Sequence, residues 1–378
     1  MKKLKVQLDF NISKKSLSLE HSFFNNPPKG IEYSKSEFKG INKKSYSFLG
    51  KVHKLLIKIL PPLEKLDKLI ISLLRKESKS DLIHFIFHLG NTNKKCVIDY
   101  EHAYNFIDIK NIENKEKTIK KLNKGNIKYL MPIHKEALKS FKLFFKEKIK
   151  IPEEIVYPTI FIPEKFRKSK KKKKKIIFIS TSNILTDKVF LIKGGLETLQ
   201  AFKNLAKKYL DYEFIILGKI PEYLKENFPR NLILNDGVPR EKMWELFNES
   251  QIFVQPCYQA PAMAFLEAMF FKLPIITTDF WGNKEYVDNL NGIRINSKQI
   301  NHIDKNNVPV YPKEILQKII KNSSKNAKKI EKAIEKLIKN PALRKKLGEN
   351  GFQRVLNGKF SIEEKNKKLR RIYEEALK

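Results

Sequence analysis

The sequence has little cysteine and no long apolar segment, and both absences narrow what the protein can be. Its 378 residues include two cysteines, Cys96 and Cys257, which are too few for a disulfide framework. No Cys/His cluster has the spacing of a zinc site, and no stretch approaches the roughly 18 consecutive apolar residues of a membrane span. The first ten residues alternate like a strand and lack the apolar core of a signal peptide. We therefore expect a protein of the reducing cytoplasm that does not cross a membrane.

Acidic residues are scarce relative to basic ones. The chain has 77 Lys and Arg against 41 Asp and Glu, so its formal charge is +36 and 36 basic groups lack a partner even if every acid is paired. Such a surface attracts nucleic acid, anionic lipid or phosphorylated small molecules. A lysine-biased composition kept for solubility is the alternative explanation for part of it. The hydrophobic content of 41% excludes a disordered chain, and the length fits two domains.

The second half of the chain alternates short apolar runs with helical patterns. Apolar runs without in/out alternation are typical of strands that are buried on both faces. The runs lie at 176–180, 213–218, 231–235, 252–256, 274–278 and 292–295. The helical patterns lie at 194–208, 240–247, 262–271 and 282–287. This half is predicted to be a doubly wound parallel α/β domain.

The first half shows a similar but less regular pattern, which predicts a second, smaller α/β domain. Strands are expected at 4–10, 81–88, 95–100, 127–132 and 154–157. Helices are expected at 50–75, 115–122 and 135–145, and from Pro312 the chain is helical to its end.

Two lysine-rich segments have more than one interpretation. Seven lysines between Lys168 and Lys175 repel one another, which predicts a solvated linker between the halves, with a nuclear-localisation or nucleic-acid segment as the alternative. Residues 51–75 combine an apolar stripe with many lysines, and Pro61-Pro62 divides them into two helices. This composition fits an interfacial helix on anionic lipid, and a core-facing helix fits the stripe as well.

Two parallel α/β domains place the carboxyl ends of their strands around one cleft, where ligands of such sheets bind. After the strand at 176–180, Lys193-Gly194-Gly195 opens a helix. Glycines there let backbone N–H groups approach a ligand, the helix N-terminus favours an anion, and Lys193 adds a positive charge. This is the outline of a phosphate site, although Gly-Gly before a helix is also common in a tight turn.

The segment 252–278 runs from a strand through small residues into a helix that carries Glu267. Small residues at a helix entrance admit a ligand closely. A carboxylate in an otherwise apolar helix is unfavourable unless it has partners. Glu267 could accept hydrogen bonds from two ribose hydroxyls, or it could be a structural group that caps nearby backbone amides.

A set of motifs in the second half resembles, in order and spacing, the nucleotide-binding half of retaining glycosyltransferases of family 4, which have the GT-B fold. The motifs are Lys193-Gly-Gly, Gly237-Val-Pro-Arg-Glu-Lys-Met, Pro256, Phe265-Leu-Glu-Ala-Met269, Leu273-Pro-Ile-Ile-Thr-Thr-Asp279 and Gly282-Asn-Lys-Glu-Tyr-Val287. The similarity covers about residues 175–375, where Asn340-Pro-Ala-Leu-Arg and Phe360-Ser-Ile-Glu resemble the family's closing helices.

The resemblance implies a GT-B-like fold, in which two doubly wound parallel-sheet domains of the Rossmann type face a cleft and helices follow at the C-terminus. Its expected parts are an acceptor-binding domain at 1–165, the lysine-rich linker at 166–175, a nucleotide-sugar-binding domain at 176–358 and a closing helix at 359–378 that packs back on the first domain.

The implied activity is transfer of a hexose from a nucleotide sugar, UDP- or GDP-linked, to a glycan or lipid-linked acceptor with retention of configuration. By the family pattern, Lys193 faces the diphosphate and Glu267 the ribose. The other residues implied to line the pocket are Gly194, Gly195, Gly237, Ala262, Gly282 and Glu285. No cofactor or metal is expected, because basic groups and a helix end would neutralise the departing diphosphate, and the chain has no Asp-x-Asp pair.

The sequence departs from the family pattern at two places in this half. Gln259 stands where the family's Glu-x7-Glu motif has its first carboxylate, and we treat it as a catalytic candidate. Ser180-Thr181 replaces the customary Gly-Arg, so a diphosphate cation is missing, and Lys188 is the candidate replacement. A third departure is Asn11-Ile-Ser-Lys-Lys15, which occupies the place of a glycine-rich loop.

In the first half, His102 follows a predicted strand, and the family often has a histidine there near the transferred sugar. His102 is therefore the second catalytic candidate, with Glu101 or Asp99 to orient it, and a buried structural histidine is the alternative.

The competing function is a catalytically impaired GT-B protein that binds a nucleotide sugar or glycan as a partner or scaffold. Nucleic-acid binding is supported by charge alone. The expected location is the cytoplasm, with the inner face of the membrane as a peripheral alternative.

Overall fold

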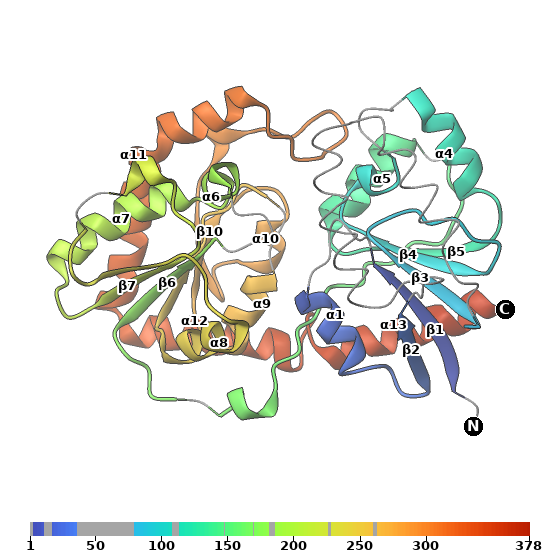
Figure 1. Ribbon diagram of the computed structural model, residues 1–378, viewed down its shortest axis with the longest axis horizontal. Coiled ribbons are helices and arrows are strands. Elements are labelled where there is room, and N and C mark those ends of the chain that lie inside the picture. The colour runs from blue at the N-terminus through green and yellow to red at the C-terminus, as the bar shows by residue number, and fades with distance from the viewer. Residues whose placement is uncertain are drawn as a thin grey trace.

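Two α/β domains lie side by side in the computed structural model (Figure 1). The structure describes residues 3–10, 17–35, 79–107, 113–146, 148–168, 170–180, 186–225, 228–259 and 263–378. We call them the N-terminal domain, built around strands β1–β5, and the C-terminal domain, built around β6–β11. This arrangement confirms the predicted fold class.

The N-terminal domain has a parallel five-stranded sheet in the order β2-β1-β3-β4-β5. Its strands are β1 (Leu4–Phe10), β2 (Ile31–Lys35), β3 (Leu82–Ile86), β4 (Cys96–Tyr100) and β5 (Ile127–Pro132). Its helices include α1 (Leu17–Phe24), the short η2 (Ala103–Asn105), α4 (Lys115–Leu122) and α5 (Lys135–Phe145). The chain passes from β1 to β2 on one side and then crosses to β3 on the other side of β1, so the β1/β3 junction is the topological switch point of this sheet.

The C-terminal domain has a parallel six-stranded sheet in the order β11-β10-β9-β6-β7-β8. Its strands are β6 (Lys175–Ile179), β7 (Glu213–Leu217), β8 (Leu232–Asn235), β9 (Ile252–Val254), β10 (Ile275–Thr278) and β11 (Gly292–Ile295). Its helices include α6 (Asp187–Ile192), α7 (Gly195–Lys208), α8 (Arg240–Glu249), α9 (Met263–Phe270), α10 (Asn283–Tyr286), α11 (Lys313–Lys339) and α12 (Pro341–Leu356). The chain reverses its direction across the sheet between β6 and β9, which places the switch point there.

The strands of the C-terminal sheet bury side chains on both faces, as their continuous apolar runs predict. In β6, Ile176 and Phe178 belong to the core beneath α7 and α11, whereas Ile177 and Ile179 belong to the core beneath α8 and α9. Since successive side chains of a strand point to opposite faces, one uninterrupted apolar run supplies both layers.

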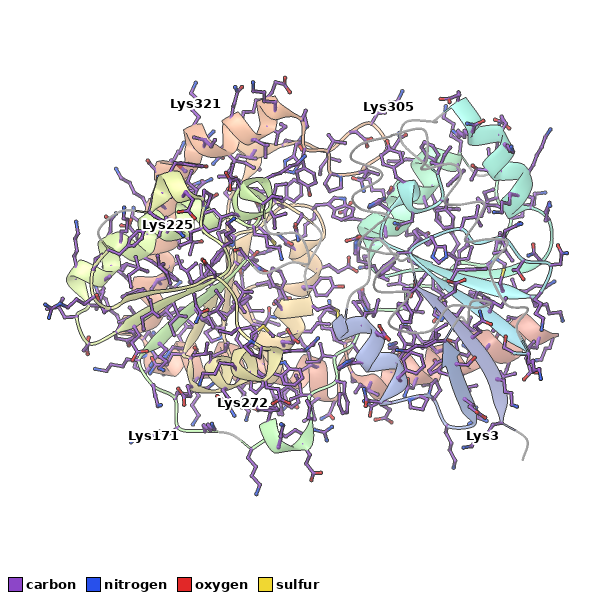
Figure 2. All side chains as sticks on the ribbon, viewed as in Figure 1. Lys3, Lys171, Lys225, Lys272, Lys305 and Lys321 are labelled. Carbon is purple, nitrogen blue, oxygen red and sulfur yellow. The ribbon has the colours of Figure 1, made fainter. Side chains whose placement is uncertain are left out.

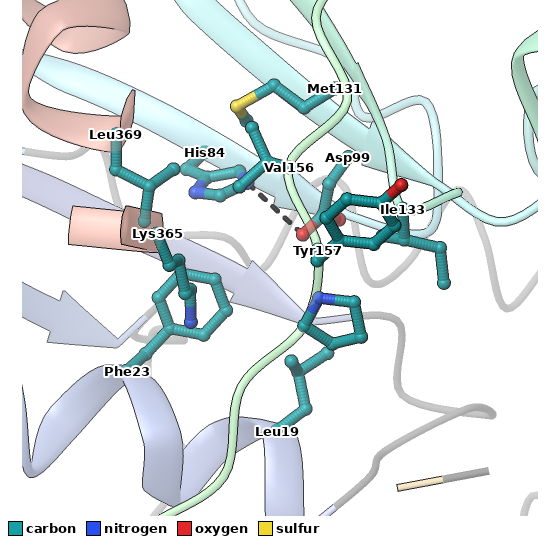
Figure 3. Close-up of a pocket in the computed structure, with 11 residues that line it drawn as sticks. Leu19, Phe23, His84, Asp99, Met131, Ile133, Val156, Tyr157, Lys365 and Leu369 are labelled. Atoms are coloured by element: carbon teal, nitrogen blue, oxygen red, sulfur yellow. Dashed lines mark ion pairs between the residues drawn. The ribbon is translucent and has the colours of Figure 1, made fainter. Parts of the chain in front are cut away.

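The last helix, α13 (Ile362–Leu377), returns to the N-terminal domain and packs against β4 and β5 (Figure 1). The hydroxyl of Tyr373 on this helix lies 2.8 Å from His84 Nδ1 and 3.1 Å from the hydroxyl of Tyr33. Figure 3 shows the small enclosed cavity beside this contact, where Lys365 of α13 is buried among side chains of the N-terminal domain, over the ring of Phe23. Within the described residues, no helix has the length and apolar character that a membrane span requires.

Several boundaries differ from the predicted ones. Residues 154–157 are not a named strand, although they run beside β5: the backbone N–H groups of Glu154 and Val156 donate hydrogen bonds to the carbonyl oxygens of Leu130 (3.1 Å) and Pro132 (3.0 Å). The helix α1 and the strand β2 were not predicted. The strand β2 has only one buried residue, Ile31, and so lacks the apolar run of a central strand. The predicted helices at 50–75 lie outside the described residues.

The lysine-rich segment that precedes β6 was predicted to be solvated, and the structure contradicts this for part of it. Lys172 donates hydrogen bonds to the carbonyl oxygens of Phe247 (3.2 Å) and Phe271 (2.8 Å), near the C-terminal ends of α8 and α9. Helix C-termini favour cations, and the burial that accompanies this contact lowers the pKa of Lys172 to about 7. Lys175 pairs with Glu249 at 3.1 Å.

Candidate active site

The loops that follow the carboxyl ends of the two sheets meet between the domains. Tyr104, just after β4, hydrogen-bonds Asp304, and its hydroxyl accepts a hydrogen bond from Asn306 at 3.0 Å. Glu136, in the first turn of α5, accepts a hydrogen bond from Asn307 at 2.8 Å. Ligands of parallel sheets bind beyond these strand ends, so the cleft bounded by these contacts is the candidate active site.

Glu285 joins the two domains. Its carboxylate accepts hydrogen bonds from the backbone N–H of Lys135, with distances of 2.9 and 3.2 Å to the two oxygens, and from the hydroxyl of Tyr157. Lys135 is the first residue of α5, so Glu285 caps the positive end of that helix from the other domain. Its side chain is held by the N-terminal domain, and its predicted role in shaping the nucleotide pocket stays a prediction.

The predicted phosphate site lies at the N-terminus of α7, at the switch point of the C-terminal sheet. Gly194 has φ +76°, and a Cβ at this position would lie 2.5 Å from the carbonyl oxygen of Pro256. A Cβ at Gly195 would lie 2.5 Å from the ring of Phe190, in α6. Gly194 thus lets α7 start close against the loop that follows β9, and Gly195 lets it start close against α6. The first N–H groups of α7 have no acceptor within the helix.

Three predicted or newly observed groups converge beside this helix start. Lys193 ends α6 with only 7% of its surface exposed, and burial lowers its pKa. The loop after β9 lies against this end of α6, because the backbone N–H of Tyr258 donates a hydrogen bond to the carbonyl oxygen of Ile192 at 2.7 Å. The structure therefore brings the loop that carries Cys257 and Gln259 beside Lys193, and sequence reasoning did not single out Cys257.

Lys188, the candidate replacement for the missing diphosphate cation, lies on the exposed face of α6. Its ammonium donates a hydrogen bond to the backbone carbonyl of Tyr311 at 3.1 Å and lies over the Tyr311 ring. This contact holds Lys188 beside the cleft. Its role toward a diphosphate stays a prediction.

Glu267 is buried at the junction of α8 and α9. Its Oε1 accepts a hydrogen bond from the Arg240 guanidinium at 2.5 Å and from the Trp244 indole N–H at 3.2 Å. Burial raises the pKa of Glu267, while the charge of Arg240 acts in the opposite sense. Oε2 accepts no hydrogen bond from the described residues, so one carboxylate oxygen remains for a ligand. Sequence reasoning named Glu267 but not its partners, although a buried carboxylate in an apolar helix requires such a cation.

Three further predicted residues have simple placements. Gly237 precedes α8 and is exposed, with open space where a Cβ would stand. Gly282 is buried and caps α10 with φ −67°. Ala262 lies outside the described residues.

His102 is the N-cap residue of η2, which follows β4. The Oδ1 atom of Asn105 accepts hydrogen bonds from the backbone N–H groups of Glu101 (2.7 Å) and His102 (3.1 Å), and these bonds fix the turn. Tyr104, in η2, hydrogen-bonds Asp304 of the C-terminal domain. The turn after β4 that carries Glu101 and His102 therefore lies beside the other domain.

Asp99 does not orient His102, contrary to one of the two predicted arrangements. Its carboxylate lies 3.4 Å from His84 Nε2 and accepts a hydrogen bond from the backbone N–H of Phe87 at 3.2 Å. Asp99 lies within β4, whereas His102 lies beyond the end of that strand, at the start of η2. Figure 3 shows the Asp99–His84 pair lining the cavity that Lys365 and Leu369 of α13 also line.

Among the residues that the structure describes, no group of three or more His, Cys, Asp and Glu side chains is placed to hold a metal ion.

The fold and the cleft define a GT-B protein, with a Rossmann-type sheet whose switch point carries a glycine-bounded helix N-terminus. Residues 161–354 match the family model of glycosyl transferases group 1, and the chain belongs to this family. No curated protein sequence matches the chain significantly.

Solved structures share this fold over nearly the whole chain at low sequence identity. A glycosyltransferase from Rickettsia africae is 15% identical, with 100% of this chain and 99% of that one covered and a TM-score of 0.55. Alr3699/HepE from Anabaena, solved with UDP, is 12% identical, with 99% and 100% coverage and a TM-score of 0.59. A sucrose-phosphate synthase from Thermosynechococcus elongatus is 12% identical, with 98% of both chains covered and a TM-score of 0.56.

Proposed function

We propose that this group 1 glycosyltransferase transfers a hexose from a UDP- or GDP-linked donor to a glycan or lipid-linked acceptor, with retention of configuration. The observation that carries the proposal is that the segments with Lys193 and Gln259, which follow β6 and β9, meet at the N-terminus of α7. The Anabaena structure of the same fold was also solved with UDP-glucose, which is consistent with a donor of this class.

The donor would lie along the carboxyl edge of the C-terminal sheet. Its diphosphate would meet the N-terminal N–H groups of α7 and the ammonium of Lys193, both of which favour an anion. The ribose hydroxyls would donate to Oε2 of Glu267, whose other oxygen is already held by Arg240 and Trp244. Because those two groups fix the carboxylate, the ribose would meet a preorganised acceptor.

The hexose would lie between Gln259 and His102, with the acceptor bound by the N-terminal domain. As the bond from the anomeric carbon to phosphate lengthens, positive charge develops on the sugar. A glutamine can hydrogen-bond the sugar hydroxyls but adds no negative charge, so we expect slow transfer. We propose that no metal cofactor takes part, because the helix end and Lys193 would compensate the charge of the departing diphosphate.

A catalytically impaired GT-B protein that binds nucleotide sugar or glycan is the second candidate. The observation in its favour is that Gln259 replaces a carboxylate while Lys188 already binds the carbonyl of Tyr311. The proposed location is the cytoplasm, with peripheral attachment to the inner face of the membrane through residues 51–75, which lie outside the described residues.

A panel of UDP, GDP and ADP in thermal-shift assays tests the proposal, since a ligand that binds only the native state raises the unfolding midpoint. Stabilisation by one nucleotide is expected, followed by release of sugar from the corresponding nucleotide sugar with and without EDTA. Binding without sugar release to any acceptor or to water favours the impaired protein. No stabilisation by any nucleotide contradicts both candidates.

A further inference from the structure

The outer face of α11 carries a continuous row of lysines. This 27-residue helix contains nine lysines and three glutamates. At 3.6 residues per turn, seven of the lysines fall within about 80° of arc and extend over about 32 Å. These seven, which we call the lysine stripe, are Lys318, Lys321, Lys325, Lys328, Lys332, Lys336 and Lys339. Figure 2 shows Lys321 projecting outward from the helix at the edge of the molecule.

Packing explains which face is left to solvent. The opposite side of α11 is apolar and packs against α7 through residues such as Ile330 and Ile334. The glutamates in the second half of the helix are turned toward α7 as well, since Glu331 accepts a hydrogen bond from Asn204 at 2.8 Å and Glu335 pairs with Lys208. The third, Glu314, lies in the first turn, before the stripe begins.

The lysines of the stripe are all exposed, and none of them makes an ion pair with a residue in the described ranges. Like charges three and four residues apart destabilise a helix, so the arrangement is unfavourable until a negatively charged partner approaches. Other basic side chains of the protein are neutralised internally, for example Lys175 by Glu249.

We propose that the lysine stripe is a docking surface for an anionic lipid bilayer. A straight row of charges on a convex helix can meet a plane along its whole length. Clusters of four to eight basic residues on an amphipathic helix are typical of binding to anionic lipid headgroups. The stripe contains no arginine and no aromatic residue, which are the groups that fork to nucleic-acid phosphates and stack on bases. A nucleic acid is therefore the less suitable partner.

The proposal goes beyond the proposed function, because it concerns binding and does not depend on the donor or the chemistry. It also differs from attachment through residues 51–75, since α11 belongs to the other domain. The two attachments make different predictions for variants of the stripe.

The test is flotation of the full-length protein with vesicles of phosphatidylcholine alone or with 30% phosphatidylglycerol, at low and high salt. The variant replaces Lys321, Lys325, Lys328 and Lys332 with glutamine. A matched control replaces four exposed lysines of the N-terminal domain, Lys117, Lys120, Lys124 and Lys139, and so changes the charge equally. A third variant replaces the four stripe lysines with arginine.

We expect binding to anionic vesicles at low salt only, because salt screens such contacts. The partition coefficient should fall at least tenfold in the stripe variant and less than twofold in the control, and the arginine variant should bind like the wild type. Circular dichroism should show the same helix content in all four proteins.

Several results would overturn the proposal. Equal losses in the stripe and control variants would mean that net charge alone drives binding. Unchanged binding of the stripe variant would assign attachment to another segment, such as residues 51–75. Absence of wild-type binding at low salt, or a stripe variant that loses duplex DNA binding but keeps vesicle binding, would also contradict a bilayer as the partner.

Discussion

Replacing Glu197 with glutamine should stabilise the C-terminal domain at neutral pH and leave its stability unchanged in acid. Glu197 lies fully buried in the first turn of α7, where its Oε1 accepts a hydrogen bond from the hydroxyl of Tyr258 at 2.6 Å. Its Oε2 has no hydrogen-bond partner in the described part of the chain. Burial raises the pKa of Glu197 from 4.5 to about 7.

The sign and size of the effect follow from proton linkage. The native state binds more protons than the unfolded state between pH 4.5 and about 7, so the free energy of unfolding falls as the pH rises through that window. At about 1.4 kcal/mol per pKa unit, ionisation of this carboxyl lowers stability by about 3 kcal/mol at pH 8. Glutamine has the shape of the neutral acid, keeps an acceptor for Tyr258 and has no such loss.

Tryptophan fluorescence during guanidinium unfolding measures the effect, because both tryptophans, Trp244 and Trp281, lie in the C-terminal domain. The two proteins should be equally stable at pH 4.5, and the variant should be about 3 kcal/mol more stable at pH 8. The matched control is Glu241→Gln at an exposed site, for which no difference is expected. Equal stability of wild type and Glu197→Gln at both pH values would refute the reasoning.

Two further substitutions test other parts of the structure. Burial lowers the pKa of Lys365 from 10.5 to about 7, so the native state binds fewer protons than the unfolded state between these pH values. The Lys365→Met variant should therefore be more stable than the wild type by roughly 4 kcal/mol at pH 7. Urea unfolding followed by circular dichroism measures this difference. That advantage should shrink toward pH 10, and one that is constant with pH would show that the titration of Lys365 is not its cause. Gln259→Glu should raise the single-turnover rate of transfer by about two to three decades while changing donor affinity less, since it restores negative charge beside the reacting sugar. A wild-type protein that is already fast and is slowed by this substitution would mean that the amide suits its donor.

Patterns set by local burial were predictable from the sequence. The apolar run of β6 supplies both cores, and the limits of β5 (Ile127–Pro132) and α5 (Lys135–Phe145) follow from their periodicity. The edge strand β2 was missed because its single buried residue, Ile31, leaves no pattern to detect. Residues 154–157 were predicted as a strand; they hydrogen-bond β5 through the N–H groups of Glu154 and Val156 but do not form a named strand.

The sequence predicts where the candidate site residues lie along the chain, but not which residues they contact. The motifs predicted Glu267 on a helix and Lys193 just before one, as the structure has them, but not the helix α6 that Lys193 ends; the roles of Lys193, Gln259 and Glu267 stay predictions. The salt bridge of Glu267 with Arg240 joins residues 27 apart, and no local pattern specifies it. The lysine-rich segment shows the same limit, because like charges in sequence predict repulsion while Lys172 finds helix-end carbonyls far along the chain.

The placement of Glu285 also required the structure. Its motif predicted a residue that shapes the pocket, which stays a prediction, but not that its carboxylate caps α5 of the other domain through the N–H of Lys135. Such a contact depends on how the two domains meet, which local sequence does not encode. The contact of Asp99 with His84 likewise joins two neighbouring strands, and local sequence does not specify it.

The central claim is that a nucleoside diphosphate binds at the N-terminus of α7 and at Glu267. Calorimetric titration of the wild type, Lys193→Ala and Glu267→Ala with the nucleotide chosen by the thermal-shift panel tests it most directly. One substitution removes a cation from the diphosphate, and the other removes the acceptor of the ribose hydroxyls, so charge-assisted contacts are lost in both. The account predicts that each folded variant binds at least tenfold more weakly than the wild type. Unchanged affinity in both variants would contradict it.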